Sequence, residues 1–214
     1  MNGHNTQFQA DANRYTNAWI VNSVQWFRNA QHGVNAQRNT LLGLLKLGYF
    51  DLVPAGGVNS VNLVVTGNQI MGGEQPIGAY WCPFIQGNVL PGYVDLPRRN
   101  PDYNFVFTAA MNGCAFVATD SPQGANFFRL YHNQHPDSNN IWTLIHNQNQ
   151  EVRSILSFDD YGQANVANGI GNAFNFLFYR NSNWVYITQP QILTPNLDVR
   201  MNPNKQKQVI AVLP

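Results

Sequence analysis

The sequence contains little charge. Only 11% of its 214 residues are charged and the formal net charge is +1, whereas about 25% is usual for a soluble domain. No basic group is larger than the pair Arg98 and Arg99 or the short run from Lys205 to Lys207. A surface that follows nucleic-acid phosphates needs several clustered cations. We therefore expect no nucleic-acid partner.

Long apolar runs are also missing. No run approaches the roughly 20 residues that a transmembrane helix needs. The first ten residues are polar and lack the apolar centre of a classical secretion signal. We therefore expect no membrane segment and no signal peptide. The expected protein is a monomer, either cytoplasmic in its producer or delivered into a host cell by a non-classical route.

Cysteine is scarce, with only Cys82 and Cys114 present. Two cysteines are too few for a disulfide framework in a chain of this length. Three readings stay open for each of them: an inert core residue, half of a single bridge, or a reactive thiol. Cys82 lies between Trp81 and Pro83 on an expected strand, which favours a buried and unreactive side chain.

The residues that are abundant indicate one globular domain spanning 1–214. Hydrophobic residues make up 44% of the chain and aromatic residues 13%, and a chain of this size buries roughly 70% of the surface that it exposes when unfolded. Asparagine (30 residues) and glutamine (17 residues) take the place of charged residues. They supply hydrogen bonds without a long-range electrostatic field.

The periodicity changes along the chain. Apolar spacings of three to five predict helices over 8–30 and 35–47, so that 1–50 is expected to be helical. Residues 58–214 show short β-rich runs separated by Gly, Pro and Asn. The predicted strands are 61–66, 77–84, 105–108, 114–119, 126–132, 152–157, 174–179 and 184–188. Helices followed by runs of strands indicate an α+β fold: an α/β sandwich of largely antiparallel sheets, with N-terminal helices on one side.

One predicted hairpin brings two reactive side chains together. Its turn, Asp120–Gly124, contains Pro and Gly in the order typical of a turn. A turn centred on Gln123 pairs residues whose numbers sum to about 246, which places Cys114 opposite His132 with Cβ atoms roughly 5 Å apart. A slip in register would change this pairing.

A thiol beside an imidazole is a nucleophile with its base. The imidazole takes the thiol proton, and the thiolate attacks a carbonyl carbon. Backbone N–H groups of Gly113 and Cys114 could bind the oxyanion, and Thr108 could hold the His132 ring. No metal or cofactor is needed. The competing interpretation is that Cys114 fills the core and His132 is a surface residue; His135 is a rival base, and Asp120, Asp159 and Asp160 are rival orienting groups.

At these residues the sequence resembles the bacterial glutamine-deamidase toxins of the cytotoxic necrotizing factor type, and most closely Burkholderia lethal factor 1. The family signature, typically Leu-Ser-Gly-Cys, reads Met111-Asn112-Gly113-Cys114 here. Thr108 matches a site threonine of that factor, and the block from Trp81 to Gly87 is similar to an upstream stretch. The resemblance covers about residues 78–132. It implies an α/β sandwich and hydrolysis of a Gln side-chain amide of a host protein to Glu through a Cys thioester, with Cys114, His132 and Thr108 as the catalytic residues.

Two other functions compete with deamidation. A transglutaminase or thiol peptidase would use the same dyad and differ in the group that resolves the thioester. A non-catalytic carbohydrate- or protein-binding module would instead use exposed aromatic side chains. Selective modification of Cys114 by a thiol reagent at neutral pH would separate the enzymes from the binding module.

Overall fold

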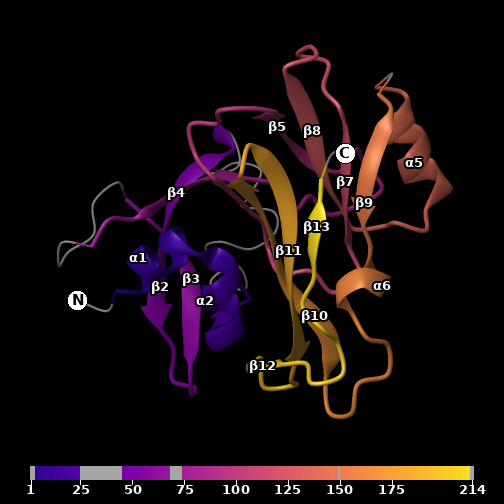
Figure 1. The fold of residues 1–214 in the computed structure, drawn as a ribbon. Coiled ribbons are helices and arrows are strands. Elements are labelled where there is room, and N and C mark those ends of the chain that lie inside the picture. Colours follow the sequence, from indigo (N-terminus) through magenta and orange to yellow (C-terminus); the bar gives the residue numbers. More distant parts are fainter. Residues whose placement is uncertain (1–2, 25–44, 68–73, 149, 213–214) are drawn as a thin grey trace.

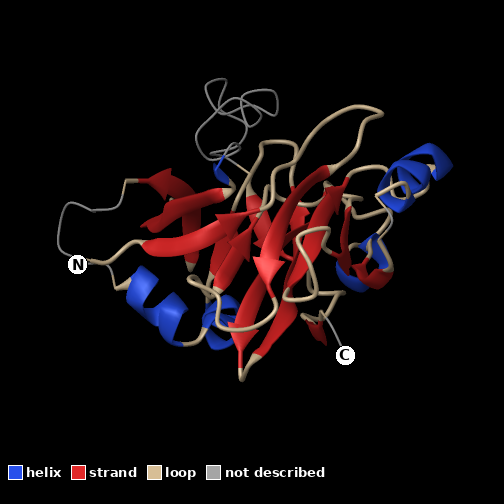
Figure 2. Ribbon diagram, turned by 90° about the horizontal axis from the view of Figure 1, so that it is seen from above, coloured by secondary structure: helices blue, strands red, loops and turns tan. Residues whose placement is uncertain are grey.

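The computed structural model describes residues 3–24, 45–67, 74–148 and 150–212. Its described part is a mixed α+β fold, as the sequence predicts. Two β-sheets pack face to face at the centre, and helices lie on the outer sides of both (Figures 1 and 2). Within these residues no helix has the length and apolar character needed to cross a membrane.

The first sheet is mixed and runs through most of the chain. In spatial order its strands are β1 (Ile20–Asn22), β3 (Ser60–Thr66), β2 (Leu47–Pro54), β4 (Ile77–Trp81), β6 (Phe105–Phe107), β10 (Ile170–Arg180), β11 (Asn183–Leu193) and β12 (Val199–Met201); β13 (Val209–Ala211) also pairs with β11. The hairpin of β10 and β11 turns through Asn181 and Ser182, whose φ angles are 50° and 62°. A two-residue turn with positive φ at both positions matches the natural twist of the flanking strands.

The second sheet is antiparallel and consists of β5 (Gly92–Pro97), β8 (Phe127–Asn133), β7 (Ala115–Asp120) and β9 (Val152–Leu156), in that order. Four helices complete the described fold: α1 (His4–Ala10), α2 (Ala12–Ala18), α5 (Asn139–His146) and α6 (Phe158–Tyr161). Ser138 begins α5, because its side chain accepts a hydrogen bond from the Ile141 N–H.

Three hydrophobic clusters hold these layers together. The first lies between α1 and α2 and the outer face of the first sheet, where Phe8 packs on Phe105, Phe107 and Phe176. The second fills the space between the two sheets and includes Cys114 and Phe116. The third joins the second sheet to α5. Each sheet thus buries both faces, and the candidate site lies in the middle cluster.

The N-terminal region differs from the prediction. The single helix predicted over 8–30 is wrong: α1 and α2 are separate helices, and strand β1 begins at Ile20. Asp11 separates the helices, because its extended backbone ends α1 and its carboxylate caps α2 at the Arg14 N–H. Residues 25–30 and most of the helix predicted over 35–47 lie outside the described residues, and Leu47 begins β2 instead.

Two buried glutamines attach β1 to the far end of the chain. The Val21 N–H donates to Gln189 Oε1 (2.9 Å), and Gln191 Nε2 donates to the Val21 carbonyl (2.8 Å). Gln189 Nε2 also donates to the carbonyls of Thr16 and Trp19. These side chains replace a neighbouring strand along β1, so part of the abundant amide content satisfies buried backbone groups.

Candidate thiol site

The predicted hairpin exists, but its register differs by two residues from the predicted one. Phe116 pairs with His132, so paired residues sum to 248 rather than 246. The turn is centred on Gly124, whose φ of +110° suits glycine. A shift of two residues keeps every side chain on its face. Cys114 therefore shares a face with His132 but lies diagonal to it, since Cys114 precedes Phe116 by two positions.

His132 is fully buried between two aromatic rings. The ring centroid of Phe84 lies 5.0 Å away and that of Phe116 lies 6.0 Å away. Burial lowers the pKa of His132 to about 3. Cys114 is 6% exposed, and burial raises its pKa to about 11, against a smaller opposing effect of a backbone hydrogen bond from Asn112. Both groups are therefore buried and neutral at pH 7, and the interpretation of His132 as a surface residue is wrong.

Thr108 makes the predicted contact with His132. Its Oγ1 lies 2.6 Å from His132 Nδ1 and 2.7 Å from the Cys82 carbonyl oxygen. A carbonyl can only accept, so the single hydroxyl proton of Thr108 goes to Cys82. Thr108 Oγ1 must then accept a hydrogen bond from Nδ1–H. This fixes the imidazole tautomer and leaves Nε2 with its lone pair. Within the described residues no hydrogen-bond partner reaches that atom, so the predicted hydrogen bond between the Cys114 thiol and His132 is not formed in this structure.

The loop before Cys114 has an open space and a tyrosine support. Gly113 has a φ of +112°, and among the described residues no atom beyond its two chain neighbours lies within 4 Å of where its Cβ would stand. The Gly113 N–H donates to the Tyr161 hydroxyl (3.3 Å), which donates to the Cys114 carbonyl (2.7 Å). An oxyanion role for the Gly113 N–H would require it to exchange the tyrosine for substrate. Sequence reasoning missed Tyr161, because nothing in its local pattern links α6 to this loop.

The upstream block lies against the same site. The Cys82 carbonyl holds Thr108, and Phe84 packs on the His132 ring. Cys82 itself is fully buried, which raises the pKa of its thiol. Neither cysteine forms a disulfide, so the reading of a single bridge is wrong.

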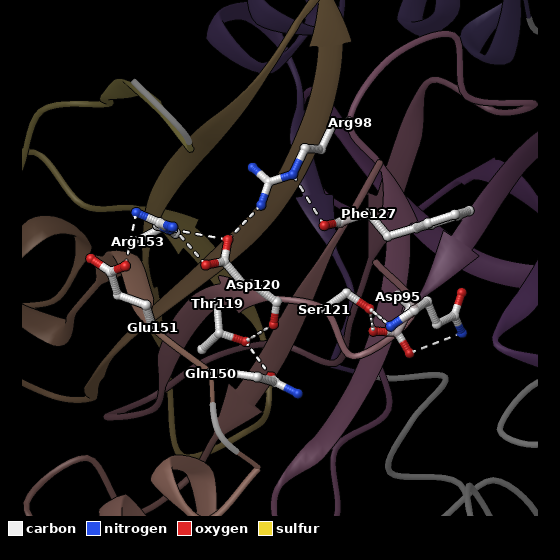
Figure 3. A network of polar contacts seen from close by, with 10 residues as sticks. Asp95, Arg98, Thr119, Asp120, Ser121, Phe127, Gln150, Glu151 and Arg153 are labelled. Carbon is white, nitrogen blue, oxygen red and sulfur yellow. Dashed lines mark hydrogen bonds and ion pairs between the residues drawn. The ribbon is translucent and has the colours of Figure 1, made fainter. Parts of the chain in front are cut away.

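Two of the three rival orienting carboxylates are engaged elsewhere. Asp120 is the last residue of β7, next to the hairpin turn, and forms ion pairs with Arg98 and Arg153, both at 2.6 Å (Figure 3). The Arg153 hydrogen bond is the largest effect that holds the pKa of Asp120 below its ordinary value. Asp160 caps α6 through the Ser157 N–H. Thr108 is therefore the group that orients His132 in this structure.

Replacing Thr108 tests that geometry. Thr108→Ala leaves two buried groups unpaired, the Nδ1–H of His132 and the Cys82 carbonyl, so we expect a loss of about 2 to 4 kcal/mol in the free energy of unfolding. Thr108→Ser keeps the hydroxyl and should lose far less. Urea denaturation of the three proteins measures the difference. Equal stability of the alanine and serine variants would contradict the hydrogen-bond assignment.

Comparison with known proteins identifies a family across almost the whole chain. Residues 17–213 match the family described as the Mcf1 activator-binding domain. No curated protein matches the sequence. The match supports the toxin-related part of the resemblance, but not its assignment to deamidase catalytic domains or to Burkholderia lethal factor. This chain belongs to the Mcf1 activator-binding domain family.

Proposed function

We propose that this chain is a protein-binding domain of a toxin system and that its partner is an activator protein. The match to the activator-binding family over residues 17–213 carries this proposal. The composition agrees with it, since a nearly neutral surface rich in amide side chains suits a protein partner better than a nucleic acid.

The test is the formation of a defined complex. We expect the purified chain to capture one protein from cells of the target host, and that protein, once purified separately, to form a complex of fixed stoichiometry in size-exclusion chromatography with light scattering. Cys114→Ser should bind it equally well, because the serine lies in the same buried place. Failure of every purified candidate to co-elute would contradict the binding proposal.

A second function is favoured by one observation at the thiol site. Thr108 fixes the tautomer in which His132 Nε2 is unprotonated, and this is the atom that a general base needs. We propose that the site hydrolyses a glutamine carboxamide on a partner protein. The same site would serve a transglutaminase or a thiol peptidase. A transglutaminase differs from a deamidase in that an amine rather than water resolves the thioester, and a peptidase differs in that it cleaves a backbone amide.

The proposed reaction balances as follows. His132 Nε2 takes the Cys114 proton while Sγ bonds to the amide carbon, and backbone N–H groups at Gly113 and Cys114 stabilise the oxyanion. The imidazolium then gives its proton to the departing nitrogen, which leaves as ammonia. His132 Nε2 then deprotonates a water molecule, whose oxygen attacks the thioester carbon. The C–S bond breaks, the partner protein leaves with a Glu side chain, and Nε2 returns the proton to sulfur.

Burial sets a condition on this chemistry. A thiol pKa near 11 and an imidazole pKa near 3 keep the proton on sulfur, and an ion pair would be costly in so dry a site. Catalysis therefore requires the site to open to water or to substrate. Binding of the activator is a natural source of that opening, since a ligand that prefers the open form shifts the population towards it.

A further inference from the structure

Most strand edges in the described residues are guarded. The outer edge of β1 is covered by the side chains of Gln189 and Gln191. β9 carries Arg153, β12 carries Arg200, and β5 carries both Asp95 and Pro97. Charges and proline on an edge prevent another strand from pairing with it. Such protection is the rule at sheet edges, so an edge without it is informative.

β13 is the exception. Its three residues, Val209, Ile210 and Ala211, include no charge and no proline. Val209 is 51% exposed, and Ala211 is exposed as well. In Figure 1, β13 lies beside β11 and close to the C-terminus. Within the described part of the chain, β11 is its only pairing partner.

The hydrogen-bond pattern shows which backbone groups point outward. The Val212 N–H donates to the Trp184 carbonyl, and the Thr188 N–H donates to the Gln208 carbonyl. Bonded pairs alternate along an antiparallel ladder, so the bonded pair between them is Ile210 with Tyr186. The N–H and C=O groups of Val209 and Ala211 therefore point away from β11.

An apolar groove adjoins this edge. Val209 and Ala211 line it together with the side chains of Phe178, Val185 and Ile187, and its volume is about 530 Å³. Its polar lining is Asn13, Arg180, Asn181 and Asn183, and none of the described residues that line it is acidic. No ion pair of Arg180 is found among the described residues.

We infer that β13 is the docking edge for an extended segment of the protein partner. This inference rests on the proposed partner-binding function and adds the surface that carries it. The segment pairs with Val209 and Ala211, places apolar side chains at alternate positions beside the groove, and carries an acidic residue at the end next to Arg180. Backbone bonds provide the attachment in this mode, and alternate side chains provide the selectivity.

Hydrogen exchange gives the first test. In the free protein we expect the Ile210 amide to exchange slowly and the Val209 and Ala211 amides to exchange fast. The probe is a fluorescein-labelled eight-residue peptide that has one aspartate at its end and alternating valine and threonine in its other positions. Its binding should slow exchange at both outward amides and raise the fluorescence anisotropy. A version with a central proline should not bind.

Variants separate the edge from the groove. Ala211→Pro removes one outward N–H without touching the bonds to β11, and should weaken peptide binding at least tenfold, while Ala211→Val should bind like the wild type. Slow exchange at Ile210 shows that β13 is still folded. Val209→Lys is a second variant with the same expected loss, and Arg180→Glu should favour a peptide with lysine in place of aspartate.

Three outcomes overturn the inference: no binding of the peptide, equal binding by Ala211→Pro, or a concentration-dependent dimer that protects the same amides and so shows a second copy on this edge. The two proposals fail separately. If a purified activator binds Ala211→Pro as well as it binds the wild type, the partner-binding proposal stands and the inference that β13 is the docking edge fails. If the peptide binds but no activator complex forms, β13 is a docking edge and the proposal of an activator partner fails.

Discussion

Cys114→Ser is expected to abolish the proposed glutamine deamidation while leaving the fold unchanged. Sulfur and oxygen are similar in size, so the packing around residue 114 should hardly respond. A serine hydroxyl, however, has a far higher pKa than a thiol and is not ionised by a lone imidazole. Removing one member of a catalytic unit costs several orders of magnitude in rate.

The measurement compares both proteins in host-cell extract, with and without the captured activator. Mass spectrometry follows Gln-to-Glu conversions and a coupled assay follows ammonia. Cys82→Ser is the matched control, because Cys82 is also a free buried thiol and should keep activity. Identical patterns from wild type and Cys114→Ser, with both folded and both bound to the activator, would leave the chain as a binding domain alone.

Acid is expected to destabilise the protein through His132. The folded-state pKa is about 3, whereas an unfolded histidine titrates near 6.5. Between these values the unfolded chain binds more protons than the folded one. The stabilising contribution of neutral His132 is therefore fully present above pH 6.5 and is lost as the pH falls towards 3. From pH 7 to pH 4.5 this one group should cost about 2 to 3 kcal/mol in the free energy of unfolding.

Urea denaturation at both pH values measures the loss. His132→Asn is the control, because its amide can still donate to Thr108 but does not titrate. This variant should be less stable than the wild type at pH 7. Between pH 7 and pH 4.5 its free energy of unfolding should fall by about 2 to 3 kcal/mol less than that of the wild type. A wild type and variant with parallel pH dependence would show that His132 is open to solvent in the folded protein.

Strand positions with alternating β-branched residues were predictable. Predicted strands 61–66 and 152–157 agree with β3 and β9 to within a residue. β10 and β11 extend well beyond their predicted ranges, because the added stretches contain buried Asn172, Gln189 and Gln191. Amides that satisfy one another inside a core give no apolar signal.

β5 was missed for a related reason. It contains Asp95, and its first and last residues, Gly92 and Pro97, are of the types that favour turns. The Asp95 carboxylate is only 9% exposed, and Arg129 pairs with it through two hydrogen bonds of 2.8 and 2.7 Å. The partner lies 34 residues away, so no local pattern reveals that a charge on this strand can be buried.

The site was only partly predictable. A period of two fixes which side chains share a face, so Cys114 and His132 were correctly placed on one face of a hairpin. Their exact pairing depended on the centre of a six-residue loop, which sequence does not determine. Burial of His132 depends on Phe84 from another segment, and support of the Cys114 loop depends on Tyr161.

The bonds from β1 to Gln189 and Gln191 have a consequence for biosynthesis. Val21 lies 168 and 170 residues before the two side chains that complete its hydrogen bonding. A ribosome releases the N-terminal strand long before it releases those glutamines. Closing such distant contacts is entropically slow, so β1 cannot complete its hydrogen bonds until β11 has been made. We expect these N-terminal elements to reach their final form only once Gln189 and Gln191 have left the ribosome, rather than as they are made.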